Sequence, residues 1–417
     1  MTNIIVGLDI GTSFVRSVIG EVSSDGAIEI IGVAKKPSSG LRSGKIVNIE
    51  ATMDCIKQVI DEVEMAAGHE VVSCVTGIGG AQVESTNQKG MVAVTARGRN
   101  NREITQADVD RVLDYANAFQ IPMDREPLHT IPREYIVDGT GGYKDPIHMI
   151  AVRLEAEVHV VTASRTAIKN ITQCVTRAGY QLDQVILKTL ACTNAVMYEE
   201  ERNLGSILID LGGGTTDVLV ITNDAPVFTT SIQVGGNLVT NDIAIVKGIP
   251  TSTAEKIKVE NGCCWMPIAQ ETEKEVLIPG IAGRGPDLSS RTELCQIIQA
   301  RMEEIFVMVK DEIMRKTSVQ SLSGSIILTG GGALLEGAVQ LAQSVFGTSS
   351  VRLGVPEKFG DSFADEYRNP EYATAVGLVA TYKNFVSTQP KKERRQRDSE
   401  GNDQGESLWQ KIKKSFF

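Results

Sequence analysis

The stretch that decides the fold reads IIVGLDIGTSFVRSVI over residues 4–19, and its pattern recurs as ILIDLGGGTTDVLVI over residues 207–221. In each copy an apolar strand ends near an aspartate, a short turn of Gly, Thr and Ser follows, and a second apolar strand begins. Glycine is expected in such a turn because it permits positive φ values and close approach of the backbone. The turn leaves N–H and hydroxyl groups beside a carboxylate, which suits a phosphate chain and its metal ion. The repeat therefore predicts a duplicated, two-lobed fold with a nucleotide in the cleft.

Three groups of residues are expected to line that cleft. Asp9 and Asp210 end equivalent strands and are the candidate catalytic residues, expected to face a hydrated Mg²⁺ because carboxylates hold that ion beside phosphate oxygens. The two turns are expected to donate N–H and hydroxyl groups to the phosphates. A third glycine turn, between a strand and a helix, is expected to let an adenosine ring lie flat on its backbone. The turn residues are Gly11, Thr12 and Ser13, then Gly212, Gly213, Gly214, Thr215 and Thr216, and finally Gly330, Gly331 and Gly332.

Composition narrows the classes of protein that remain. The 417 residues are enough for two large domains or four subdomains, and 42% hydrophobic with 23% charged residues is ordinary for a soluble globular protein. A net charge of -10 argues against nucleic acid as a partner of the folded body. Seven cysteines without a CxxC pair, and only four histidines, indicate reduced thiols and neither a zinc nor a haem site. His129 and His159 have no partner cluster and are interpreted as ordinary surface or strand histidines.

The order of predicted elements fits this two-lobed α/β plan. Within residues 28–75 the pattern predicts a third strand, an amphipathic helix and a further strand. From 84 to 162 it changes to a small α+β insertion, whose helix opens at Thr105 with a capping box. The second repeat leads to a mixed helical region and then to a final apolar helix at 373–385. Because the chain enters a strand directly and has no apolar run near the roughly 18 residues that cross a bilayer, it is expected to stay in the cytoplasm.

The C-terminal segment differs from the body in charge and pattern. From residue 390 onward there are eight Lys or Arg against five Asp or Glu, a net charge of +3, which leaves -13 for the rest. Residues 387–406 lack core-forming side chains and are expected to be a disordered linker. Residues 407–417 predict a short amphipathic helix lying in a membrane interface and attracted to anionic lipids; the alternative is a helix docked on the protein's own core. The apolar and basic residues of this helix are Leu408, Trp409, Lys411, Ile412, Lys413, Lys414, Phe416 and Phe417.

The three glycine turns, with the connecting helices around Ala191 and Gly377, resemble the actin/Hsp70/sugar-kinase ATPase superfamily. In relatives a Glu and a Lys one helical turn apart contact the ribose, and Glu255 and Lys258 match that pattern; the alternative is a solvated helix face. Chaperone relatives position the attacking water with a glutamate where this chain has Lys188. A protonated lysine cannot act as a base, so the resemblance implies binding of ATP with Mg²⁺ and at most slow hydrolysis.

With the insertion and the C-terminal helix included, the chain resembles the bacterial FtsA family over essentially its whole length. Further local matches are HTIPREY at 129–135 and SRTEL at 290–294. The resemblance implies an ATP-binding, filament-forming actin homologue that tethers FtsZ filaments to the cytoplasmic face of the inner membrane at the division septum. It also implies that later division proteins bind the insertion, and that Arg301 contacts the acidic C-terminal tail of FtsZ; the alternative for Arg301 is an exposed helix arginine.

Two other functions remain as alternatives. One is the FtsA-like, PilM-type cytoplasmic component of type IV pilus assembly, and the other is a chaperone-type or sugar-kinase-type ATPase. The C-terminal helix favours the division protein. In the terms of the FtsA family the predicted boundaries are subdomain 1A at 1–83 and 163–200, subdomain 1C at 84–162, subdomain 2A at 201–235 and 321–386, subdomain 2B at 236–320, the linker at 387–406 and the membrane helix at 407–417.

Overall fold

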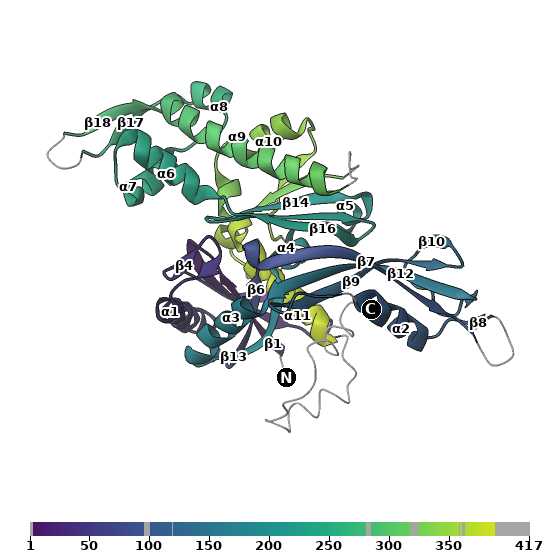
Figure 1. The fold of residues 1–417 in the computed structure, drawn as a ribbon. Coiled ribbons are helices and arrows are strands. Elements are labelled where there is room, and N and C mark those ends of the chain that lie inside the picture. Colours follow the sequence, from purple (N-terminus) through teal and green to yellow (C-terminus); the bar gives the residue numbers. More distant parts are fainter. Residues whose placement is uncertain are drawn as a thin grey trace.

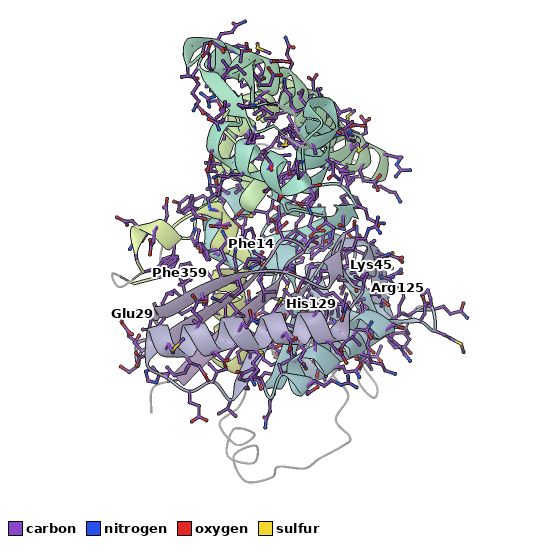
Figure 2. The ribbon with its side chains drawn as sticks, turned by 90° about the vertical axis from the view of Figure 1, so that its left-hand side faces the viewer. Phe14, Glu29, Lys45, Arg125, His129 and Phe359 are labelled. Atoms are coloured by element: carbon purple, nitrogen blue, oxygen red, sulfur yellow. The ribbon has the colours of Figure 1, made fainter. Side chains whose placement is uncertain are left out.

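The computed structural model describes residues 3–95, 101–118, 120–280, 285–317, 324–357, 359–360 and 363–387. Two lobes, each built around a five-stranded sheet, lie one above the other (Figure 1). Each sheet contains one copy of the sequence repeat as an antiparallel hairpin. Figure 2 turns the molecule by 90° and shows the second lobe above the first from the side. The predicted duplicated, two-lobed α/β fold is therefore confirmed.

The first lobe is a sheet with helices packed on it. Its sheet strands are β1 (Asn3–Ile10), β2 (Phe14–Val22), β3 (Ile28–Pro37), β6 (Ser73–Ile78) and β13 (Gln181–Leu187), and a small hairpin consists of β4 (Leu41–Arg42) and β5 (Lys45–Ile46). Its helices are α1 (Ile49–Ala67), α3 (Arg165–Arg177) and α4 (Lys188–Val196), whereas the next helix, α5 (Glu199–Leu204), packs on the second lobe. The sheet order β13-β6-β1-β2-β3 is a three-stranded antiparallel meander continued by two parallel strands. The predicted apolar stripe of α1, with Ile56, Val59 and Val63, is fully buried in this core.

The second lobe repeats that plan. Its sheet strands are β14 (Ser206–Leu211), β15 (Thr216–Thr222), β16 (Ala225–Ile232), β19 (Ile326–Thr329) and β20 (Val351–Leu353), and a separate hairpin consists of β17 (Glu275–Ile278) and β18 (Asp287–Ser290). Its helices are α6 (Gly236–Lys247), α7 (Thr251–Asn261), α8 (Met266–Glu271), α9 (Arg291–Lys316) and α10 (Ala338–Phe346), with a short 3-10 turn η2 (Gly331–Leu334). After β20 the short 3-10 turns η3 (Asp365–Tyr367) and η4 (Pro370–Tyr372) contribute Tyr367 and Tyr372 to a core cluster shared with the first lobe. The order β16-β15-β14-β19-β20 again joins an antiparallel meander to two parallel strands.

The insertion extends from the first lobe as a sheet with one helix. It contains η1 (Gly80–Gln82), β7 (Val83–Ala93), β8 (Arg102–Glu103), α2 (Gln106–Asn117), β9 (Arg125–Val137), β10 (Thr140–Tyr143), β11 (Ile150–Ala151) and β12 (Arg153–Ser164). The four longest strands form one sheet in the order β10-β9-β12-β7. The predicted capping box of α2 is confirmed, because the Asp108 carboxylate accepts from the Thr105 N–H at 3.0 Å.

The two histidines of the insertion are strand residues but not surface residues. His129 in β9 and His159 in β12 are each only 1% exposed, so the interpretation as surface histidines is wrong. The reason is that the rest of the protein covers this part of the sheet. The His129 Nε2 accepts from the Leu187 N–H at 2.9 Å, and His159 contacts Thr229 of the second lobe.

The last described helix, α11 (Ala373–Ser387), packs through the middle of the molecule, as predicted for a final apolar helix. A Cβ atom on Gly377 would lie 2.1 Å from the Ala191 carbonyl oxygen of α4. A Cβ atom on Gly7 of β1 would lie 2.4 Å from the Ala375 carbonyl oxygen. Both glycines are therefore required by the close approach of α11 to its neighbours.

Two predictions fall outside the residues that the structure describes. They are the linker, from residue 388 onward, and the amphipathic helix at 407–417. Within the described part of the chain, none of the helices combines the length and the apolar character that crossing a bilayer requires. All seven cysteines are buried free thiols.

Candidate nucleotide-binding site

The two repeat turns are closed by equivalent hydrogen bonds. In the first, the Gly11 N–H donates to the Phe14 carbonyl oxygen at 3.0 Å. In the second, the Gly212 N–H donates to the Thr215 carbonyl oxygen at 2.9 Å. The repeat in the sequence thus gives two turns with the same backbone arrangement, one at the cleft edge of each lobe.

The two turns touch each other across the cleft, as the sequence predicts. A Cβ atom on Gly213 would lie 2.1 Å from the Ser13 hydroxyl oxygen, and one on Gly214 would lie 2.7 Å from the Thr12 hydroxyl oxygen. The expected positive φ is wrong for all four glycines of the two turns, none of which has one. Lack of room for a side chain, and not backbone conformation, is what requires glycine here.

A cleft of about 620 Å³ opens beside these turns. That volume is in the range of sites for drug-sized ligands. Of the residues predicted to line the cleft, Thr216 alone does not line it. It is fully buried at the start of β15, and its hydroxyl donates to the Val234 carbonyl oxygen at 2.9 Å. The predicted residues that line the cleft are Asp9, Gly11, Thr12, Ser13, Asp210, Gly212, Gly213, Gly214, Thr215, Glu255, Lys258, Gly330, Gly331 and Gly332.

In the first lobe the cleft carboxylate is already paired. The Lys188 ammonium lies 2.7 Å from an Asp9 carboxylate oxygen and donates to the Ile10 carbonyl oxygen at 2.9 Å. The Arg16 guanidinium approaches the other Asp9 oxygen at 3.9 Å. Burial opposes the charge of Lys188, but the attraction of Asp9 outweighs it and holds the pKa of the ammonium above its ordinary value. Lys188 is therefore a fixed cation at the base of the cleft.

In the second lobe two carboxylates lie side by side, and among the described residues no Lys or Arg forms an ion pair with either of them, although the charge of Lys188 acts to lower the pKa of both. Asp210 and Asp217 are partners in the β14–β15 ladder. Burial, with the neighbouring charges of Asp217 and Asp9, raises the pKa of Asp210 to about 7. Burial also raises the pKa of Asp217, although its carboxylate accepts from the Gly80 N–H at 3.0 Å. Asp217 was not among the residues singled out from the sequence.

The carboxylates suit a hydrated ion better than a directly bound one. No group of three or more His, Cys, Asp or Glu side chains within the described ranges has the arrangement that holds a metal ion directly. Mg²⁺ commonly keeps several of its waters and is held by one or two carboxylates together with phosphate oxygens. Asp9 and Asp210 therefore fit the predicted water-mediated role, and Asp217 adds a third negative charge.

The third glycine turn forms an open wall of the cleft. Gly330 has a φ of 82°, and a Cβ atom there would lie 2.3 Å from an Asp210 carboxylate oxygen. A Cβ atom on Gly331 would meet no atom within 4 Å, so this face of the backbone is open. A planar ring can therefore lie against the backbone at this point, as the sequence predicts for adenosine.

The predicted ribose pair lies on α7, which forms a neighbouring part of the cleft wall. The Lys258 ammonium is 2.7 Å from the Glu255 carboxylate and donates to the Thr240 hydroxyl oxygen at 2.8 Å. The Lys258 side chain is only 13% exposed, whereas that of Glu255 is 45% exposed, so the alternative of a solvated helix face fits Glu255 but not Lys258. Arg291 and Glu336 form a second ion pair in this part of the cleft. The sequence did not predict that they line the cleft, although Arg291 belongs to the local family match at 290–294.

Arg301 lies away from the cleft, on the outer side of α9. Its guanidinium is 2.6 Å from the Asp242 carboxylate of α6 and also pairs with Glu304. The Arg301 side chain is 28% exposed. An acidic peptide at this position would therefore compete with two carboxylates of the chain itself.

Comparison with known proteins places this fold and cleft in a family. A profile described as "Cell division protein FtsA" matches residues 207–377, and one described as "SHS2 domain inserted in FTSA" matches residues 80–162. The chain is 41% identical to the cell division protein FtsA of Borreliella burgdorferi over 90% of both chains. It is 42% identical to that of Pseudomonas aeruginosa over 90% of this chain and 88% of the relative.

Solved structures agree on the fold. The PilM-PilN type IV pilus biogenesis complex matches with a TM-score of 0.65 at 17% identity, over 91% of this chain and 98% of the other. MreB5 of Spiroplasma citri bound to ADP matches with a TM-score of 0.54 at 16% identity, over 93% of this chain and 99% of the other. The fold is actin-like, and the extent of identity to the curated relatives shows that this chain belongs to the FtsA family of cell division proteins.

Proposed function

We propose that this chain binds Mg·ATP in the cleft, forms filaments with copies of itself and tethers FtsZ filaments to the cytoplasmic face of the inner membrane at the division septum. Later division proteins bind its insertion. Membership of the FtsA family supports the division role. The observation that carries the nucleotide role is the contact of two glycine turns beside three carboxylates, at a cleft of about 620 Å³.

The residues of the cleft fit Mg·ATP chemically. Backbone N–H groups of the two turns and the hydroxyls of Thr12, Ser13 and Thr215 hold the phosphates, and Glu255 with Lys258 holds the ribose. Asp9 and Asp210 face the waters of Mg²⁺, which neutralises phosphate charge when bound. The structures of MreB5 of Spiroplasma citri bound to ADP and to AMPPNP support a nucleotide in this fold.

Hydrolysis in this cleft is slow. Lys188 is held by Asp9 and the Ile10 carbonyl oxygen, and its raised pKa keeps it protonated. A protonated ammonium cannot accept a proton from an attacking water. The Asp9 carboxylate is already paired with the Lys188 ammonium at 2.7 Å. The bound nucleotide therefore acts chiefly as a ligand that holds the two lobes together.

The partners act on two separate parts of the chain. Arg301 receives the acidic C-terminal tail of FtsZ, which displaces the carboxylates of Asp242 and Glu304 from the guanidinium. The helix at 407–417 binds anionic lipids through its lysines and its apolar side chains. Self-assembly is supported by the neighbouring fold of the MamK double helical filament, which matches with a TM-score of 0.51 at 13% identity.

A second candidate function is a PilM-type component of pilus assembly. The observation that favours it is the TM-score of 0.65 with the PilM-PilN complex. That likeness, at 17% identity, concerns the fold, whereas the division relatives share about 40% of their residues with this chain over nine-tenths of its length. Tethering of FtsZ is therefore the first proposal to test.

The test is recruitment of labelled FtsZ from the same organism to vesicles that contain anionic lipid, with the full chain and Mg·ATP present. Recruitment is expected, and deletion of residues 407–417 or Trp409→Glu is expected to abolish vesicle binding and recruitment together. Asp210→Ala is expected to weaken Mg·ATP binding by about 10- to 100-fold, measured with a fluorescent ATP analogue, because a metal-facing carboxylate is lost.

Arg301→Glu separates the two partners. This variant is expected to coat vesicles normally while FtsZ stays in solution. Arg315→Glu is the matched control. Arg315 lies on the same helix, its side chain is 69% exposed, and it pairs with Glu312, one helical turn away. If the unmodified chain coats vesicles but recruits no FtsZ, the tether proposal fails and the pilus-type function is favoured.

A further inference from the structure

The insertion meets the second lobe along two strand edges. β7 is the edge strand of the insertion sheet and β16 is the edge strand of the second five-stranded sheet, and Figure 1 shows them next to each other. Side chains of β7 bond to the backbone of β16. The Ser85 hydroxyl donates to the Thr229 carbonyl oxygen at 2.9 Å, and the Asn87 amide nitrogen donates to the Val227 carbonyl oxygen at 2.9 Å. From Ser85 to Asn87 the residue number rises by two along β7, while the partner on β16 falls from Thr229 to Val227. The two edge strands therefore run antiparallel.

A buried histidine fixes the orientation of Asn87. His159 lies opposite Asn87 in the β7–β12 ladder, with its Nδ1 2.7 Å from the Asn87 side-chain oxygen and its Nε2 3.1 Å from the Thr229 hydroxyl. Because Asn87 uses its nitrogen to reach Val227, its oxygen accepts, so the His159 proton lies on Nδ1 and Nε2 accepts from Thr229. Burial lowers the pKa of His159 to about 3, so the ring is neutral. The histidine therefore holds both sides of the junction in one register.

The same hairpin of the second lobe also reaches the nucleotide cleft. Asp217, on β15, accepts from the Gly80 N–H at 3.0 Å, and Gly80 lies in the connection that leads into β7. Asp217 is paired with Ser231 in the β15–β16 ladder, one residue pair from the end of the hairpin that lines the cleft. The β15–β16 hairpin thus contacts the insertion twice, once at the cleft through Asp217 and once further along through Thr229 and Val227.

The junction is polar, which distinguishes it from the apolar packing of α11 on α4. Asn87 is exposed and Ser85 is half-buried, so water can replace their partners when the strands separate. Separation of an apolar core would instead expose hydrophobic side chains. A polar junction of this kind can open and close without loss of the fold.

We infer that Ser85, Asn87 and His159 form a latch that couples the nucleotide state of the cleft to the position of the insertion against the second lobe. The inference rests on the proposed binding of Mg·ATP. Asp217 and Thr229 belong to one hairpin, so a displacement of that hairpin on nucleotide binding changes the contact to Gly80 and the latch together. The insertion then presents a different position to its partners in the nucleotide-bound and nucleotide-free protein.

Hydrogen exchange measured by mass spectrometry on the full chain, with and without Mg·ATP, tests the latch. In the unmodified protein, Mg·ATP is expected to slow exchange in the cleft turns and, by at least about fivefold, in β7 and β12. In Asn87→Ala and in the double variant Ser85→Ala/Asn87→Ala, the slowing is expected to remain in the turns and disappear from β7 and β12. Gln88→Ala is the matched control, because the Gln88 side chain bonds to Thr86 on its own strand.

Each contrary result has a distinct meaning. Protection of the cleft turns without any response of β7 and β12 in the unmodified protein would overturn the latch alone. A response of β7 and β12 that survives in both latch variants would also overturn it. If Mg·ATP protects neither the turns nor the insertion, the proposed nucleotide site fails and the coupling fails with it. Asn87 is exposed, so its replacement removes a hydrogen bond to His159 but no apolar contact of the core.

Discussion

The two repeat hairpins share a backbone but differ in charge. Asp9 and Asp210 occupy equivalent positions on the first strands, and their ladder partners on the second strands are Arg16 and Asp217. One hairpin therefore sets a cation beside its cleft carboxylate, and the other sets a second carboxylate there. The turns themselves are closed by the same hydrogen bond in both hairpins.

This difference shows what the duplication keeps and what it changes. Both lobes keep a turn that is closed by the same N–H to carbonyl hydrogen bond. The first lobe balances its own charge, since Lys188 and Arg16 accompany Asp9. The second lobe holds Asp210 and Asp217 with raised pKa values and so favours an added cation. For the proposed binding of Mg²⁺, the asymmetry predicts that the second lobe attracts the ion, and variants of each hairpin test this prediction.

The largest expected effect is loss of the internal cation of the first lobe. Lys188→Met leaves the Asp9 carboxylate, whose side chain is 8% exposed, with only the more distant Arg16. Removing one partner of a buried pair destabilises a protein by about 3–5 kcal/mol. A lower urea midpoint is therefore expected, and added Mg²⁺ should recover part of the loss by replacing the missing charge.

Lys256→Met is the control for that variant. Lys256 is 74% exposed and 3.9 Å from Glu260, so its replacement is expected to change stability little. Equal midpoints for Lys188→Met and Lys256→Met would mean that the first hairpin does not depend on its own cation, and the comparison between the lobes would lose its basis.

A smaller effect is expected where the two hairpins touch. Gly213→Ala places a Cβ atom 2.1 Å from the Ser13 hydroxyl oxygen, and overpacking of this kind costs about 1–3 kcal/mol. Ser13→Ala removes that oxygen, so the double variant Ser13→Ala/Gly213→Ala is expected to regain most of the lost stability in thermal unfolding. If the double variant is no more stable than Gly213→Ala alone, the turns do not touch as described.

The sequence predicts the repeat, the two facing turns and the order of the lobes, because these depend on local patterns. Asp217 could also have been predicted, because an alignment of the two copies matches it with Arg16. The position of Arg291 at the cleft could not have been predicted from local patterns, because only tertiary folding brings the start of α9 there. The sequence was compatible with His159 as a surface or a strand histidine. Its burial could not be predicted, because Thr229 of the second lobe, which contacts it, lies some seventy residues further along the chain. Thr216 belongs to the same motif as its neighbours, but strand alternation turns it into the lobe.

Per pH unit, the smallest expected effect comes from the charge of the second hairpin in the absence of Mg²⁺. The pKa of Asp210 is raised from 3.8 to about 7 in the folded protein. Between these values the folded state holds a proton that the unfolded state has released, so the stability contributed by this group falls as pH rises through that window and is constant above it. The slope cannot exceed about 1.4 kcal/mol per pH unit.

Comparison of the unmodified protein with Asp210→Asn isolates the contribution of Asp210 together with the groups coupled to it, Asp9, Asp217 and Lys188, because groups elsewhere titrate equally in both. Urea denaturation without Mg²⁺ is expected to show the variant gaining relative stability from about pH 4 to about pH 7 and no further gain above that. Saturating Mg²⁺ should reduce the difference, because the cation stabilises the ionised carboxylate of the unmodified protein only. A difference that stays constant over this range would mean that Asp210 is ionised throughout, and the second hairpin would then need no cation to carry its two carboxylates.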